Sequence, residues 1–252
     1  MAPAASRKDA SKIMLIVYIA VAVYSVVELY DLLPPHICGV TKAIPALLCA
    51  CNSYLLKVKA EKKKKMRRHA PARYCMPVVL GLLFCAMGDL SLRLEGVSNS
   101  GVPYFIIGLA SFLIGHVMFV IAYVRDGGNG LQLGWGVLLY GFLSAYVIVI
   151  LQHVASDDVV LKIGVVAYCV VIATMCHRSI SLSRDAYPSV ESTQYAVIGS
   201  ALFVVSDSIL AYNRFVAPVP LQSVWVLGTY FSAIALISAS CAGMDRWSVG
   251  WE

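Results

Sequence analysis

Charged residues are scarce in this sequence. Asp, Glu, Lys and Arg make up 13% of its 252 residues, whereas a typical soluble domain carries about 25%. A soluble protein of this length needs a polar surface that so few charged residues do not provide. Hydrophobic residues make up 60% of the chain, which excludes a disordered protein, because disordered chains are poor in aliphatic and aromatic residues. The composition and its long apolar runs predict an all-α, polytopic membrane protein.

The sequence also lacks the motifs of several common site types. Its eight cysteines form no CxxC pair, and most of them lie in apolar runs, which predicts neither a disulfide framework nor a zinc site. The HExxH, GxSxG and Walker-loop motifs are absent. We therefore expect no cofactor and no metal. One alternative stays open, because two carboxylates and a histidine within the membrane could still hold a metal ion.

Apolar runs separated by helix-breaking residues predict about eight transmembrane helices. The breakers are Pro, Gly, Asn and Asp residues, together with a strongly basic run at residues 57–73. At roughly 20 residues per span, eight helices fill the chain, so residues 1–252 are predicted to form a single integral membrane domain. The predicted spans are residues 13–33, 36–56, 75–94, 102–124, 131–151, 159–177, 195–214 and 220–242.

The basic residues are unevenly distributed along the chain. Residues 57–73 hold nine Lys or Arg residues and a single Glu. This run lies between two apolar runs, which favours a cytoplasmic loop beside an anionic leaflet over a nucleic-acid site. With the N-terminus in the cytoplasm, sixteen of the twenty Lys and Arg residues lie on the cytoplasmic side. We therefore predict cytoplasmic termini, no nucleic-acid partner, and a multi-pass protein of the endoplasmic reticulum or another internal membrane.

Three ionisable side chains are predicted to lie inside the membrane at similar depths. An ionised side chain at the bilayer centre costs about 2.5–3.5 kcal/mol, so such residues face the bundle interior and mark candidate functional sites. A helix rise of about 1.5 Å per residue places Asp89, Asp207 and Lys42 in one layer of the outer half of the membrane. Gly88 and Ser206 directly precede the two aspartates, and small residues there let a neighbouring helix approach closely.

Each of these residues also has a purely structural explanation, which the sequence leaves open. Asp89 can pair with Arg93 one turn later on the same helix, and Asp207 can pair with Arg214. Lys42 can extend its amine to the membrane surface, as lysines near the ends of spans do. The functional interpretation differs from these alternatives because it requires the three side chains to meet.

Short motifs lie in or near the predicted spans at Lys42-Ala43-Ile44-Pro45, Gly88-Asp89, Gly115-His116, Ser206-Asp207 with Asn213, and Thr229-Tyr230. Their order and spacing resemble the lysoplasmalogenase, or YhhN-like, family of membrane proteins. The resemblance covers about residues 40–240 and is strongest over residues 200–235. Asp89 and Asp207 are predicted to be the catalytic acid–base pair, because they share a depth and each follows a small residue. The substrate-binding residues are expected to be Lys42, His116, Asn213 and Tyr230.

The resemblance implies hydrolysis of the vinyl ether of lysoplasmalogens to a fatty aldehyde and glycerophospho-choline or -ethanolamine, with a lysophospholipid and membrane lipid as partners. A vinyl ether is cleaved by protonation of its β-carbon, which creates an oxocarbenium ion that water captures. One protonated carboxyl and one ionised carboxylate suit these steps, as they suit the related cation in glycosidases. The sequence does not assign the two roles. Lys42 is expected to bind the substrate phosphate as a point charge and to keep one aspartate ionised.

Other functions compete with this hydrolase. Intramembrane Asp, Lys and His residues also occur in small-molecule and proton-coupled transporters, which remain the alternative function. Many transporters carry paired half-helices interrupted by Gly or Pro at matching positions, and the two halves of this sequence show no such pair. A non-catalytic scaffold leaves the aspartates unexplained, and an ester-cleaving lysophospholipase usually needs a nucleophile and base that the sequence does not show. The oligomeric state stays open.

Overall fold

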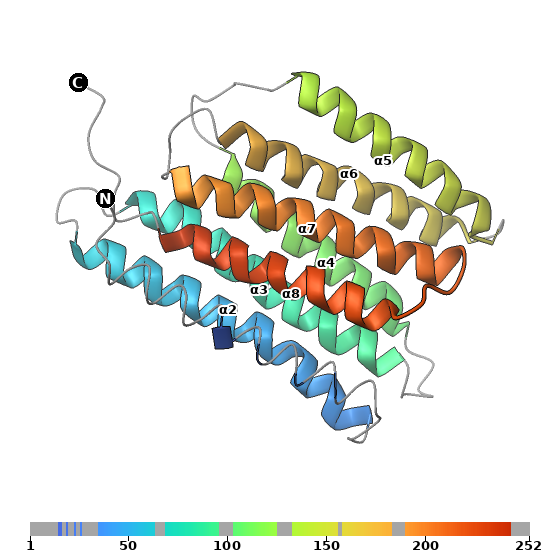
Figure 1. Ribbon diagram of the computed structural model, residues 1–252, viewed down its shortest axis with the longest axis horizontal. Coiled ribbons are helices and arrows are strands. Elements are labelled where there is room, and N and C mark those ends of the chain that lie inside the picture. Colours follow the sequence, from blue (N-terminus) through green and yellow to red (C-terminus); the bar gives the residue numbers. More distant parts are fainter. Residues whose placement is uncertain are drawn as a thin grey trace.

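The described part of the chain is a bundle of α-helices (Figure 1). The computed structural model describes residues 35–63, 69–95, 103–124, 133–155, 158–182 and 190–242, together with residues 15, 16, 19, 23 and 26. All regular secondary structure within these residues is helical. The helices are α2 (Pro35–Lys63), α3 (His69–Glu95), α4 (Tyr104–Tyr123), α5 (Leu133–His153), α6 (Val159–Leu182), α7 (Val190–Phe215) and α8 (Gln222–Ala239).

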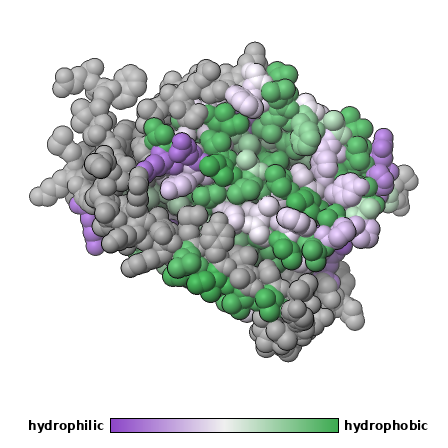
Figure 2. Space-filling model, in the orientation of Figure 1, coloured by the Kyte–Doolittle hydropathy of each residue, from purple (hydrophilic) through white to green (hydrophobic). Residues whose placement is uncertain are grey.

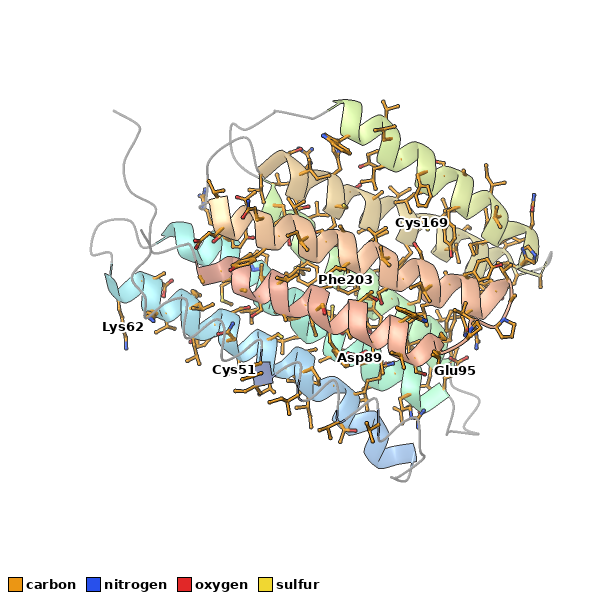
Figure 3. All side chains as sticks on the ribbon, in the orientation of Figure 1. Cys51, Lys62, Asp89, Glu95, Cys169 and Phe203 are labelled. Atoms are coloured by element: carbon orange, nitrogen blue, oxygen red, sulfur yellow. The ribbon has the colours of Figure 1, made fainter. Side chains whose placement is uncertain are left out.

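The helices run side by side, and consecutive helices point in opposite directions (Figure 1). Helix α3 packs against α2 and α4, and α8 packs against α7 and α2. Helix α6 contacts α4, α5 and α7, while α5 lies at the margin of the bundle (Figure 1). Lys62 and Glu95 lie at opposite ends of the bundle, and Asp89 lies nearer the Glu95 end (Figure 3).

The surface and the helix lengths are those of a multi-pass membrane protein. Six of the described helices, α3 to α8, are long and apolar enough to cross a membrane. Hydrophobic side chains cover much of the middle of the face in Figure 2, and hydrophilic side chains lie toward its two ends. Large apolar residues such as Leu138, Phe142 and Ile163 are exposed, as lipid-facing residues are.

These six helices do not confirm the predicted count of eight spans, and α2 is not among them. Most of the first predicted span, 13–33, lies outside the described residues, so this span stays a prediction. The second, 36–56, lies within α2, which continues through Lys57 to Lys63. Part of the basic loop predicted at 57–73 is therefore helical, since α2 ends at Lys63 and α3 begins at His69, and residues 64–68 lie outside the described residues. Lysine is a good helix former, and a helix can continue in the same direction after it leaves the apolar layer.

The membrane orientation is a prediction that accessibility can test. The sixteen-to-four distribution of basic residues predicts that the end of the bundle carrying residues 57–73 faces the cytoplasm. We expect a cytoplasmic protease or a membrane-impermeant cytoplasmic label to reach a tag placed at residues 64–68 and tags at both termini. Labelling of residues 34–38 from the cytoplasm would contradict the predicted orientation.

Glycine residues allow a close helix crossing between α3 and α4. A methyl group at Gly115 would lie 3.0 Å from the Gly81 carbonyl oxygen, and one at Gly88 would lie 2.5 Å from the Phe112 ring. Ser206 allows a close approach between α7 and α8, where its hydroxyl donates a hydrogen bond of 3.2 Å to the Val226 carbonyl. The close approach predicted beside each aspartate is confirmed. Small residues thus hold Asp89 and Asp207 against neighbouring helices.

Gly115→Leu is expected to destabilise the fold by at least about 2 kcal/mol, because the larger side chain meets backbone rather than a flexible side chain. Thermal unfolding of the purified protein in detergent measures this change. Gly141→Leu is the matched control, since no described atom lies within 4 Å of the position a methyl group would take there. Equal melting temperatures for the two variants would contradict the tight α3–α4 crossing.

Candidate functional site

The bundle encloses a cavity of about 150 Å³ between its helices. Four charged side chains line it: Lys42, Asp89, Asp207 and Arg214. The rest of the lining comes from helices α3 to α8 and is largely aliphatic and aromatic. An ionisable group in such surroundings needs partners, because an unpaired charge in an apolar interior is strongly unfavourable.

Asp89 is held by two partners from other helices. Its carboxylate is almost fully buried, with the residue 1% exposed. The Tyr230 hydroxyl donates a hydrogen bond of 2.6 Å to Asp89 Oδ2, and Lys42 Nζ lies 4.0 Å from Asp89 Oδ1. The Lys42 side chain is 19% exposed, and its amine lines the cavity beside Asp89. Three of the predicted site residues, from α2, α3 and α8, therefore meet at one point.

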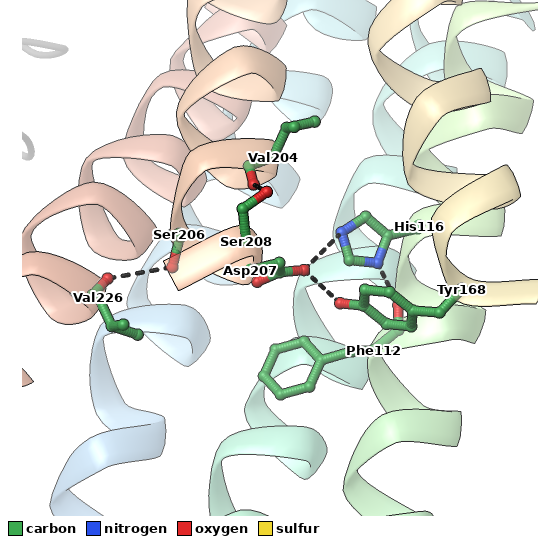
Figure 4. Close-up of polar contacts among 8 residues, drawn as sticks. All are labelled: Phe112, His116, Tyr168, Val204, Ser206, Asp207, Ser208 and Val226. Carbon is green, nitrogen blue, oxygen red and sulfur yellow. Dashed lines mark hydrogen bonds and ion pairs between the residues drawn. The ribbon is translucent and has the colours of Figure 1, made fainter. Parts of the chain in front are cut away.

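Asp207 is held by a second pair of residues (Figure 4). The Tyr168 hydroxyl of α6 donates a hydrogen bond to Asp207 Oδ2. His116 Nε2, from α4, lies 3.8 Å from the same oxygen. Arg214, which the sequence offered as a structural partner for Asp207, instead donates to Glu95 Oε1 at 2.7 Å, so that alternative is wrong.

The orientation of the His116 ring is fixed by its other nitrogen. Nδ1 lies 2.6 Å from the Phe112 carbonyl oxygen, and a carbonyl only accepts, so Nδ1 carries a hydrogen. Nε2 is then the nitrogen that faces Asp207 (Figure 4). Nε2 is buried and has no hydrogen-bond partner among the described residues. His116 is fully buried and stands behind Asp207 rather than in the cavity wall.

Asn213 lies apart from the other predicted site residues. Its side-chain oxygen accepts a hydrogen bond of 2.9 Å from the Val219 backbone N–H, which fixes the connection between α7 and α8. It is not among the residues that line the cavity. Tyr168, in contrast, is a site residue that the sequence did not predict. It donates a hydrogen bond to Asp207 and lines the cavity, but no sequence motif distinguishes it among the fourteen tyrosines.

The two carboxyl groups thus share one cavity but have different neighbours. Asp89 lies beside an ammonium group, which favours an ionised carboxylate. Among the described residues, Asp207 has no cation at this distance; its Oδ2 lies 3.8 Å from an imidazole nitrogen, which is beyond hydrogen-bond distance. No group of three or more His, Cys, Asp or Glu side chains within the described ranges is placed to hold a metal ion. The arrangement suits a reaction that needs one carboxylic acid and one carboxylate.

Comparisons with known proteins agree with the motifs found in the sequence. The sequence profile of the YhhN family matches residues 37–241. Lysoplasmalogenase TMEM86B of Sus scrofa is 32% identical over 179 residues, which are 66% of this chain and 72% of that protein. The human proteins named lysoplasmalogenase TMEM86B and TMEM86A are 29% and 30% identical, over 64% and 65% of this chain. The matched segment spans 61% and 64% of these human relatives, which is just under two thirds of their length. No solved structure matches the chain significantly.

Proposed function

The chain belongs to the YhhN family, and on that premise we propose that it is a lysoplasmalogenase. It would hydrolyse the vinyl ether of a lysoplasmalogen within the membrane, giving a fatty aldehyde and glycerophosphocholine or glycerophosphoethanolamine. The observation that carries this proposal is the cavity that brings Asp89 and Asp207 together among apolar side chains. The apolar lining suits the alkenyl chain, and the two carboxyl groups suit the acid and base steps.

Asp207 is proposed as the acid. The reaction begins when a proton is added to the β-carbon of the vinyl ether, and this converts the double bond and the ether oxygen into an oxocarbenium ion. A carboxyl that bears a proton next to the His116 nitrogen can donate that proton. The hydrogen bond from Tyr168 holds the Asp207 carboxyl in place. After the transfer, Asp207 is left as a carboxylate, which the same hydrogen bond stabilises.

Asp89 is proposed as the base. Beside Lys42 it is suited to stay ionised, so it can stabilise the oxocarbenium ion and accept a proton from the attacking water. The water oxygen bonds to the carbon that carries the ether oxygen, and a hemiacetal forms. The hemiacetal then breaks its bond to the glycerol oxygen, which takes the proton from Asp89 and leaves as an alcohol. The remaining hydroxyl oxygen gives its proton to Asp207 and becomes the aldehyde oxygen, so both carboxyl groups return to their starting states. One water is consumed, and no oxidant or reductant is required.

The experiment is a product analysis of the purified protein in deuterated water. Given a vinyl-ether lysolipid, the protein is expected to release a fatty aldehyde with one deuterium on the carbon next to the carbonyl, where the acid step places it. The acyl-ester analogue should release little fatty acid, which separates this activity from that of an ester hydrolase. No aldehyde above a control without protein would overturn the proposed function.

Lys42→Met is expected to lower kcat by about 10-fold or more and to change KM little, because the amine acts through Asp89. Two roles are expected for Lys42 from the sequence, phosphate binding and ionisation of an aspartate, and the distance of 4.0 Å between Lys42 Nζ and Asp89 Oδ1 favours the second. Methionine keeps most of the side-chain bulk, and Lys42→Arg serves as a control that keeps the charge. Steady-state kinetics in mixed micelles measure both constants. A raised KM at unchanged kcat would contradict this role and indicate that Lys42 binds the substrate phosphate.

A further inference from the structure

Arg214 occupies a distinct place in the cavity wall, at the last turn of α7. Its side chain is 49% exposed, unlike the buried groups around the aspartates. Arg214 Nη2 donates to Glu95 Oε1 at 2.7 Å, and the guanidinium lies over the Phe105 ring, 4.6 Å from its centroid. The guanidinium is therefore held in a defined plane while remaining open to a ligand.

The position of Arg214 matches the dimensions of a lysoplasmalogen. It follows Asp207 by seven residues on the same helix, which is a rise of about 10 Å. The β-carbon of the vinyl ether and the phosphorus of the headgroup are separated by seven bonds, which an extended chain spans in roughly 8 Å. Glu95, the partner of Arg214, lies at the end of the bundle, and Asp89 lies deeper along α3 (Figure 3). A substrate with its vinyl ether at the aspartates would thus place its phosphate near Arg214.

We propose that Arg214 binds the phosphodiester of the lysolipid headgroup, an inference that rests on the proposed function. A guanidinium presents five N–H donors in a fixed fork that matches phosphate oxygens. Among the described residues, Glu95 is the acceptor bonded to it, so donors remain for a phosphate. Gln222 and Ser223, at the start of α8, also line the cavity and add polar side chains on that side. Lys42, the other cation in the wall, lies beside Asp89 instead.

The competing explanation is that Arg214 and Glu95 only join α7 to α3. Loss of either partner would then have the same effect on the protein. An ion pair this exposed contributes little to stability, so neither substitution is expected to unfold the chain. In a phosphate site the two partners differ, because Glu95 competes with the phosphate for the guanidinium. This difference makes the two single variants the central comparison.

The experiment measures binding first, with ligands that cannot be hydrolysed. The saturated-ether analogue of the lysolipid carries the phosphodiester, and the matching alkylglycerol lacks it. Arg214→Gln is expected to weaken binding of the lysolipid analogue at least about 10-fold, the scale of one charge-assisted hydrogen bond, and to leave the alkylglycerol unchanged. Glu95→Gln should leave lysolipid binding equal or tighter, and Arg214→Lys should restore part of it. Lys62→Gln, at the opposite end of the bundle, is the matched control for lost positive charge.

Kinetics with the vinyl-ether lysolipid complete the test, where Arg214→Gln should raise KM with kcat nearly unchanged. Equal losses for both ligands, or equal losses for Arg214→Gln and Glu95→Gln, would overturn the phosphate site. If the unchanged protein does not cleave the vinyl ether but the binding differences appear as expected, the proposed function is wrong and the phosphate site is supported. The two failures are therefore distinguishable.

Discussion

Asp207→Asn is expected to lower kcat by at least about 10²-fold, the usual scale for the loss of a general acid. An amide has the shape of a carboxyl group but has no acidic proton to give to carbon. Its oxygen can still accept the hydrogen bond from Tyr168, so the local structure should persist. The aldehyde released in single-turnover reactions measures the chemical step directly, apart from product release.

Two controls separate lost chemistry from lost structure. Asp158→Asn changes a carboxyl outside the cavity, where the side chain caps the start of α6 by accepting the Leu161 N–H at 2.9 Å. Asparagine caps helices as well as aspartate does, so this variant should retain full activity. Asp207→Asn should also bind the saturated-ether lysolipid as the unchanged protein does. A well-folded Asp207→Asn protein with near-normal turnover would show that Asp207 is not the acid.

The approach of Lys42 to Asp89 could be predicted from the sequence, whereas the contact of Tyr230 with Asp89 could not. Polar groups in apolar helices are unfavourable unless they find one another, and helix rise alone set Asp89 and Lys42 at similar depths. Depth along a helix does not determine the rotation of that helix about its axis, which only the structure shows. That rotation decides that Lys42 faces Asp89 while His116 faces Asp207.

The structural roles of Tyr168 and Asn213 could not be predicted from the sequence. Helix α6 is apolar on all sides, so no hydrophobic face indicates how it is turned, and Tyr168 looks like a packing residue until Asp207 is placed beside it. Asn213 is predicted as a site residue because it follows Asp207 in the matching segment, but its side-chain oxygen accepts a hydrogen bond from the backbone of the α7–α8 connection. The contacts of both residues depend on where neighbouring chain segments lie, and the spacing of residues along one helix does not predict that.

The ends of the helices were harder to predict than their centres. The apolar length of a span is set by the bilayer, whereas a helix ends where its backbone loses its hydrogen bonds. Helix α2 therefore continues past its apolar part, where Lys57 and Glu61 form an ion pair of 3.5 Å one turn apart. Polar residues outside the bilayer are compatible with a continuing helix, so charge alone did not mark a loop.

Asp89→Asn is expected to lower kcat by at least about 10²-fold as well, but for a different reason. The amide can still accept the hydrogen bond from Tyr230, yet it cannot take a proton from water or stabilise the oxocarbenium ion. The substitution also leaves the Lys42 amine without its anionic partner in a largely apolar wall. Removing one member of such a pair is destabilising, so thermal unfolding should report a loss that Asp207→Asn does not show.

A double-mutant cycle tests whether Lys42 acts through Asp89. In the Asp89→Asn background, Lys42→Met is expected to lower activity little further and to recover part of the lost stability, because the unpaired charge is gone. In the Asp207→Asn background, Lys42→Met should lower activity by the same factor as in the unchanged protein, since Lys42 lies beside Asp89 rather than Asp207. Residual turnover is measured in single-turnover reactions over long times. Full additivity of Lys42→Met with Asp89→Asn would mean that Lys42 contacts the substrate itself. The proposal that Lys42 supports Asp89 as the base, while His116 lies beside Asp207 as the acid, would then be wrong.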